Sequence, residues 1–180
     1  MDFNKYQNIN NVIKKMGGVK ETMLNKKKYE KAKQSWEQFT PKQLEIIDSE
    51  IATAPQIYLS LVTSEAICLY NMHTFTAIPV KDIVWIYGSE FIQTMYFIPY
   101  NKTYSLIVMD RYGQTYTLGM VSTWGFSKKK PNEERIDIIR NVIGKNRKGI
   151  VYGYNKEICD LFTKNFQDAV KMVDDNSNDY

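Results

Sequence analysis

Apolar side chains in the first part of the chain recur every three or four positions, which is the period of an amphipathic helix. Residues 3–16 and residues 41–52 each carry such a stripe. The second starts with Thr40 as the N-cap, Pro41 at the first helical position and Gln43 to complete a capping box. We predict a helix over each range. Residues 19–39 are rich in lysine with thinly spaced apolar positions, and we interpret them as a further helix. The helical pattern ends before Pro55, because a residue that precedes proline avoids the helical region.

After Pro55 the apolar pattern changes to short β-type runs separated by turn residues. Seven such runs follow one another at 57–62, 66–70, 75–80, 83–87, 91–98, 104–109 and 114–121. The intervals leave no room for crossover helices, which excludes a parallel sheet. We therefore predict an antiparallel sheet, closed as a barrel or folded as a sandwich.

The centre of the predicted sheet is the sequence FTAIPVKDIVWIYG. Its two runs, Phe75–Val80 and Ile83–Tyr87, are joined by Lys81-Asp82, and the second run is crowded with β-formers. We place both runs in the middle of the sheet and interpret Trp85 as a core residue. Lys81-Asp82 is interpreted as a turn.

Helical periodicity returns after the sheet. An apolar face after Glu133 predicts a helix. A short strand is predicted at Gly149–Gly153, and a wide apolar face after Asn155 predicts a last helix. The chain is thus predicted to be α+β, with a helical segment at 1–54, a β domain with C-terminal helices at 55–173, and a disordered polar tail at 174–180.

Composition is that of a globular protein, with 43% hydrophobic and 13% aromatic residues in 180. Cys68 and Cys159 are expected to be buried thiols in a reducing compartment. The N-terminus lacks the apolar core of a signal peptide, and no apolar run is long enough to span a membrane. We expect a cytoplasmic location with no transmembrane segment.

Positive charge is concentrated after the predicted sheet, where residues 127–150 hold eight basic and three acidic residues. The candidate basic patch consists of Lys128, Lys129, Lys130, Lys145, Arg147 and Lys148. Such a patch could bind anionic lipid headgroups or nucleic acid. However, only four of the 24 basic residues are arginine, the usual reader of phosphate and bases. We therefore favour an AT-rich coding bias as the explanation of the lysine richness.

Catalytic and metal-binding patterns are missing from the sequence. His73 is the single histidine and falls in a predicted turn, and with Cys68 and Cys159 it does not form a zinc set. The glycines at 144 and 149 lack the residues that follow in a phosphate-binding loop. We expect no catalytic residues, no metal and no cofactor, although two carboxylates could still converge in the folded chain.

Five tyrosines along the predicted hairpins could form a stacking platform for single-stranded bases: Tyr96, Tyr100, Tyr104, Tyr112 and Tyr116. Residues 91–126 offer only Lys102 and Arg111 as cations beside them. We therefore interpret these tyrosines as half-buried strand residues.

Seven antiparallel runs followed by an amphipathic helix resemble a pleckstrin-homology-like (PH-like) domain. The stretch Ile78–Tyr87 and the later IVYGY of Ile150–Tyr154 resemble two structural signatures of a bacterial PH-like family of unknown function. The likeness covers residues 55–173 and implies a PH-like sheet without established catalytic residues. This chain departs from a simple PH domain in its helical front segment and in the extra helix and strand at 132–153.

The first functional hypothesis is a non-enzymatic binding or scaffolding module whose partner is another protein. The second is binding of anionic lipid or nucleic acid through the candidate basic patch. The third is an enzyme with an unrecognised site. The sequence leaves the oligomeric state open, and also whether the front helices dock on the sheet.

Overall fold

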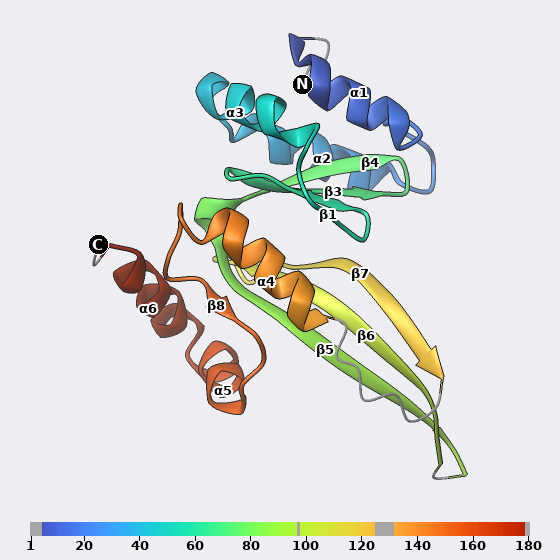
Figure 1. The fold of residues 1–180 in the computed structure, drawn as a ribbon, viewed down its shortest axis with the longest axis vertical. Helices are drawn as coiled ribbons and strands as arrows, with labels where there is room; N and C mark the ends of the chain where they lie inside the picture. Colours follow the sequence, from blue (N-terminus) through green and yellow to red (C-terminus); the bar gives the residue numbers. More distant parts are fainter. Residues whose placement is uncertain (1–4, 97, 125–131, 179–180) are drawn as a thin grey trace. The chain divides into compact units, whose positions relative to one another are not determined.

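The structure is a computed structural model that describes residues 5–96, 98–124 and 132–178. The chain divides into two compact units, residues 1–81 (unit 1) and residues 82–180 (unit 2). Each unit combines helices with an open four-stranded sheet, so the chain is an α+β protein (Figure 1). The boundary expected after residue 54 falls inside unit 1, because the helices before it and strands after it share one apolar core.

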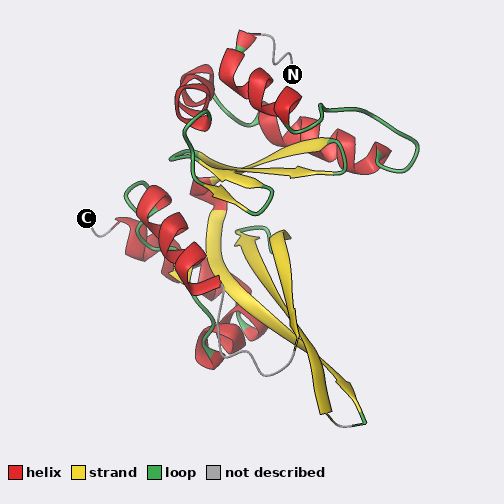
Figure 2. Cartoon of the chain, turned by 45° about the vertical axis from the view of Figure 1, so that its right-hand side comes forward, coloured by secondary structure: helices red, strands yellow, loops and turns green. Residues whose placement is uncertain are grey.

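Among its described residues, unit 1 holds three helices followed by four short strands. These are α1 (Gln7–Lys15), α2 (Lys26–Glu37), α3 (Pro41–Ile51), β1 (Gln56–Ile57), β2 (Ser60–Val62), β3 (Ala66–Asn71) and β4 (Thr74–Pro79). The strands form an antiparallel sheet in the order β1-β2-β3-β4, and the helices cover one of its faces (Figures 1 and 2).

Helix α3 begins where the sequence predicts. The Thr40 hydroxyl accepts from the Gln43 backbone N–H over 3.3 Å, and the Gln43 side-chain oxygen accepts from the Thr40 N–H over 3.1 Å. This reciprocal pair is the predicted capping box, and it satisfies backbone donors that the first turn leaves without a helical partner.

The front helices dock on the sheet of unit 1 through α2 and β4. The fully buried Trp36 donates its indole N–H to the Phe75 carbonyl over 2.6 Å and stacks on the Phe75 ring at 5.4 Å. One residue earlier, the Ser35 hydroxyl accepts from the Ala77 N–H over 2.9 Å. The lysine-rich segment thus packs on the first sheet.

Unit 2 holds three long strands, one short strand and three helices in the part of the chain that the structure describes. They are β5 (Ile83–Met95), β6 (Ile98–Asp110), β7 (Thr115–Trp124), α4 (Asn132–Ile143), β8 (Val151–Tyr152), α5 (Lys156–Lys164) and α6 (Phe166–Asn178). The sheet order is β7-β6-β5-β8, antiparallel except for the parallel pair of β5 and β8. Within this unit, β5 and β6 extend well beyond the helices (Figure 2).

The predicted single sheet or barrel of about seven strands is wrong, because the described strands form two open sheets. The runs Phe75–Val80 and Ile83–Tyr87 do not pair with each other. A 3₁₀ turn at Val80–Asp82 separates them, and β4 pairs with β3 while β5 pairs with β6. β4 ends at Pro79, and the Val80 N–H that follows donates to the Glu65 carbonyl over 2.9 Å.

Two predicted turns of the second half are strand. Gly88-Ser89 lies inside β5, and residues 99–102 lie inside β6. The two predicted runs 83–87 and 91–98 are therefore largely one thirteen-residue strand. The β5–β6 connection instead follows Met95, where Tyr96 has a positive φ of 52°.

The helices of unit 2 cover both faces of its sheet. Successive strand residues point to opposite faces. On one face Gly88 lies against Asn132 at the start of α4, and on the other Trp85 stacks on Phe162 of α5 at 5.0 Å. Tyr87 and Gly88 of β5 therefore face different helical layers.

The predicted last helix is two helices, and the predicted disordered tail is partly helical. α5 ends at Lys164, because the next residue, Asn165, has φ and ψ of −134° and 58°, outside the helical region. α6 then continues through Asp174 to Asn178. Asp174 accepts from Arg111 and Arg147, which explains why this polar stretch stays attached to the unit.

Cys68 is buried, as expected, whereas Cys159 is only half-buried, and both are free thiols. No helix among residues 5–96, 98–124 and 132–178 is both long and apolar enough to cross a membrane.

Candidate functional site

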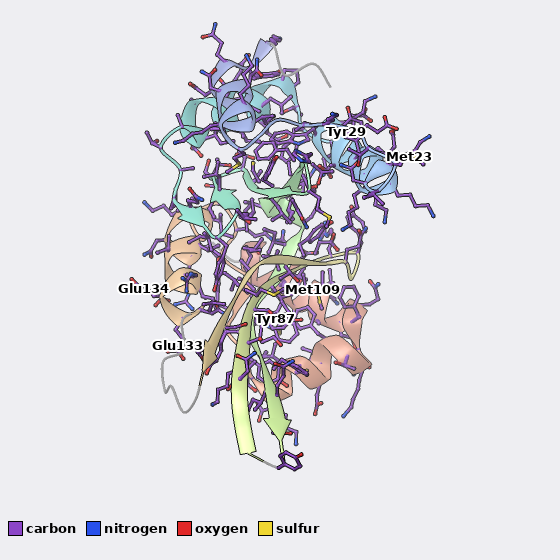
Figure 3. All side chains as sticks on the ribbon, turned by 90° about the vertical axis from the view of Figure 1, so that its right-hand side faces the viewer. Met23, Tyr29, Tyr87, Met109, Glu133 and Glu134 are labelled. Carbon is purple, nitrogen blue, oxygen red and sulfur yellow. The ribbon has the colours of Figure 1, made fainter. Side chains whose placement is uncertain are left out.

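A groove of about 560 Å³ lies beside β5 in unit 2. It is lined by Tyr87–Glu90 of β5, by the first turn of α4 and by the chain that follows β8. Figure 3 labels Tyr87 on the strand and Glu133 and Glu134 at the start of α4. The groove thus brings strand backbone, aromatic rings and carboxylates together.

The edge of β5 that borders the groove is paired only near its start. β8 pairs with Trp85 and Ile86, and the Gly153 N–H donates to the Ile86 carbonyl over 2.8 Å. β5 itself continues to Met95. Among the described residues, no strand pairs with this edge beyond Ile86.

The direction of the backbone groups along this edge follows from the strand geometry. Alternate residues of a strand aim their N–H and C=O groups at opposite neighbours. The Ile86 carbonyl points to the β8 side, and the β5–β6 register shows no shift from Trp85 to Gln93. Gly88, Glu90 and Ile92 therefore direct their backbone groups toward the open edge.

One wall of the groove is aromatic. Tyr154 is 62% exposed, and its ring centroid lies 6.3 Å from that of Trp85 and 6.5 Å from that of Tyr87. The Trp85 indole N–H donates to the Gly153 carbonyl over 2.8 Å and fixes the chain that carries Tyr154. Gly153 has a φ of +83°, a conformation that glycine adopts without strain. The local backbone therefore holds an exposed tyrosine beside the open edge.

The other wall is the start of α4, which closely approaches Gly88 on β5. A Cβ atom at Gly88 would lie 3.3 Å from the Asn132 Cβ. The Asn132 side chain is buried and donates to the Ser105 carbonyl over 3.0 Å. Asn132 thus anchors the first turn of α4 on the sheet and places Glu133 at the groove.

Two carboxylates, those of Glu90 and Glu133, line the groove. Glu90 pairs with Lys102 at 3.1 Å on the exposed strand surface, and the hydrogen bond to Glu90 raises the pKa of Lys102. Glu133 is exposed at the opposite wall.

Tyr87 and Tyr154 stay uncharged near neutral pH. A hydrogen bond with Cys159 raises the pKa of Tyr154, and burial raises the pKa of Tyr87. The charged groups that line the groove are therefore the carboxylates of Glu90 and Glu133, while the phenols of Tyr87 and Tyr154 offer hydrogen bonds and ring faces.

Only Lys145, Arg147 and Lys148 of the six residues of the predicted basic patch lie among the described residues. Lys128, Lys129 and Lys130 lie outside the described residues. Arg147 is half-buried and donates to the Ile83 carbonyl over 2.9 Å and to Asp174 over 2.7 Å, so its guanidinium supports the fold. Lys145 and Lys148 are exposed.

The five hairpin tyrosines do not share one environment. Tyr104 is buried at the groove, and the Tyr116 hydroxyl donates to Asp110 over 3.1 Å. Tyr96 and Tyr112 are exposed, while the side chain of Tyr100 lies outside the described residues. The interpretation as a half-buried strand residue is confirmed for Tyr116, whereas Tyr104 is a buried strand residue and Tyr96 and Tyr112 lie in turns.

His73 lies in the turn between β3 and β4, as predicted, and its Nδ1 is 3.3 Å from the Tyr70 hydroxyl. Within the described ranges, no group of three or more His, Cys, Asp or Glu side chains is placed to hold a metal ion.

Sequence reasoning did not single out Tyr87, Glu90, Glu133 or Tyr154 as site residues. One sequence signal could have indicated the open edge. The β-type pattern around Gly88 is much longer than the two-residue strand β8 that pairs with it. The walls depend on contacts between distant segments and have no local sequence signature.

Comparison of the chain with protein-family models, with curated proteins and with solved structures found no match.

Proposed function

We propose that unit 2 is a non-enzymatic binding module that captures an extended segment of a partner protein as an added strand along β5. The observation that carries this proposal is that β8 pairs with only two of the thirteen residues of β5, directly beside a groove. An exposed strand edge is a template for pairing with another chain. Domains that bind peptides in this way gain affinity from main-chain hydrogen bonds and specificity from neighbouring side-chain sites.

The chemistry of the groove favours a peptide with a basic side chain. Lysine or arginine could stack on the exposed ring of Tyr154 and lie near the Glu133 carboxylate. A cation over an aromatic face gains about 0.5–1 kcal/mol at an exposed site. The backbone of Gly88 and Glu90 would set the register, and the basic side chain would give selectivity.

A PH-like relationship for residues 55–173 is retained as a proposal. Its support is the antiparallel arrangement of β5, β6 and β7 followed by C-terminal helices. The first part of that range, up to Lys81, belongs to unit 1. The part of this range that supports the PH-like relationship is therefore residues 82–173, in unit 2.

A peptide selection tests the proposed function. Phage displaying random peptides would be selected on the full chain, and the enriched peptides titrated by fluorescence anisotropy. We expect enriched sequences with a basic residue, and at least tenfold weaker binding to Tyr154→Ala. Tyr112→Ala is the matched control, since Tyr112 is a similarly exposed tyrosine in a turn of the same unit.

A second pair of variants measures the contribution of the backbone N–H at the open edge of β5. Glu90→Pro and Glu90→Thr both remove the carboxylate and its pairing with Lys102, but only proline removes the N–H that faces the open edge. We expect Glu90→Thr to bind and Glu90→Pro to fail while circular dichroism shows both folded. Equal binding by the two variants would refute strand addition.

A further inference from the structure

Two apolar side chains of unit 1 stand completely in solvent. Met23 and Leu24 occupy the middle of a turn between α1 and α2, and each is 100% exposed. Figure 3 labels Met23 beside the start of α2. Single exposed apolar residues are ordinary on protein surfaces, but two fully exposed neighbours on one turn call for a physical explanation.

The turn is held firmly in this conformation. The Asn25 side-chain oxygen accepts from the Thr22 N–H over 2.7 Å, and its amide donates to the carbonyls of Lys20 at 2.9 Å and Met72 at 2.8 Å. Asn25 is only 4% exposed. A buried side chain that bonds both sides of the turn fixes Met23 and Leu24 outward, so their exposure is built into the fold.

The hairpin between β3 and β4 adds a third apolar side chain to the same tip. Met72 is 64% exposed, and its sulfur lies 3.8 Å from the Lys28 ammonium. The neighbouring His73 carbonyl accepts from the Lys20 N–H over 3.0 Å. The Lys20 N–H and the Asn25 side chain therefore tie the α1–α2 turn to two carbonyls of the hairpin. We call Met23, Leu24 and Met72 the apolar tip.

Lysines surround the apolar tip. Lys20 precedes the turn, and Lys26, Lys27 and Lys28 form the first turn of α2; all four are exposed. Positive charge at the start of a helix opposes the helix dipole, and no acid stands in the first turn to offset it. The three lysines at the start of α2 therefore do not stabilise the helix. An anionic surface next to the tip would attract these lysines and offset their repulsion by the helix dipole.

We propose that unit 1 docks on an anionic lipid bilayer through this tip, with Met23 and Leu24 inserted at the boundary of headgroups and acyl chains. Apolar insertion and lysine–phosphate attraction together are what interfacial membrane binding requires. Nucleic acid fits less well, because apolar side chains at the tip gain little from a phosphate backbone. Moreover, unit 1 contains no arginine for base or phosphate recognition.

Co-sedimentation of the full chain with lipid vesicles tests the proposal. We expect binding to phosphatidylcholine vesicles that contain phosphatidylserine, at least tenfold weaker binding to pure phosphatidylcholine vesicles, and release by added salt. M23S/L24S should lose at least tenfold in partitioning to the anionic vesicles and keep its circular dichroism spectrum, because neither side chain is buried. Leu59→Ser is the matched control, since Leu59 is also exposed in unit 1.

Lysine variants separate the two contributions. K26Q/K27Q/K28Q should bind anionic vesicles no better than neutral ones. No binding to anionic vesicles at low salt would overturn the proposal, as would full binding by M23S/L24S. Binding to a single-stranded oligonucleotide that M23S/L24S leaves unchanged, without vesicle binding, would assign the lysines to nucleic acid and also overturn it.

Discussion

Arg147 donates from its guanidinium to the Asp174 carboxylate over 2.7 Å. The same arginine donates to the Ile83 carbonyl at the start of β5, and Arg111 also pairs with Asp174. Arg147 and Asp174 therefore hold α6 to the sheet of unit 2. The sequence had placed Arg147 in an exposed basic patch and Asp174 in a disordered tail.

We expect Arg147→Ala to lower the free energy of unfolding by about 2 kcal/mol, because hydrogen bonds to charged groups contribute about 1.5–3 kcal/mol each and the side chain is largely shielded. Urea unfolding followed by tryptophan fluorescence measures the change. Lys164→Ala is the control, since Lys164 pairs with Asp160 at 3.6 Å on an exposed helix surface, where pairs contribute at most about 1 kcal/mol. Equal effects of the two substitutions would contradict the structural role of Arg147.

Two tyrosine-to-phenylalanine changes in unit 2 should have opposite effects. The Tyr152 hydroxyl is buried without a hydrogen-bond partner among the described residues, and burial raises the pKa of Tyr152 to about 12 against the opposing charge of Arg140. Tyr152→Phe should therefore leave stability unchanged or raise it by up to about 1 kcal/mol. Tyr116→Phe should lower it by a similar amount, because it removes the bond to Asp110. Thermal unfolding that shifts both variants in the same direction would conflict with this assignment.

The two cysteines should differ in reactivity. Cys68 is completely buried, and burial raises the pKa of its thiol far above the usual value, so the reactive thiolate does not form near pH 8. Cys159 is half-buried. We expect iodoacetamide to label Cys159 in the folded protein and both cysteines in urea, as measured by peptide mass spectrometry. Equal labelling rates in the folded state would contradict the burial of Cys68.

Trp36 should be a main support of unit 1. Trp36→Phe keeps an aromatic ring but removes the indole donor to the Phe75 carbonyl and leaves space in the core. We expect a loss of about 2 kcal/mol in the free energy of unfolding. Gln34→Ala, on the exposed side of the same helix, should change stability by less than about 0.5 kcal/mol. Denaturation followed by circular dichroism compares the two.

Local signals predicted the local structure of this chain well. The capping box at Thr40 was readable because it involves residues three positions apart, and the cap at Asn155, which accepts from the Glu157 N–H over 2.8 Å, is equally local. Helix starts of this kind depend on neighbouring residues alone.

The sheet arrangement and the groove were out of reach because they depend on distant partners. The sequence pattern predicted a turn at Gly88. In the structure β5 continues through Gly88, and Asn132 from a distant segment packs against it. The pairing of β8 with Trp85 and Ile86 joins segments more than sixty positions apart. Arg147 likewise gave no sign that its partner would be Asp174.

Backbone hydrogen exchange at the open edge of β5 tests the central claim most directly. Amide exchange of the full chain would be compared with and without a peptide obtained from the selection. Strand addition predicts that the N–H groups of Gly88, Glu90 and Ile92 become protected at least tenfold, while those of Tyr87 and Ser89, already directed toward β6, change little. Peptide binding that leaves Gly88, Glu90 and Ile92 unprotected would contradict the account.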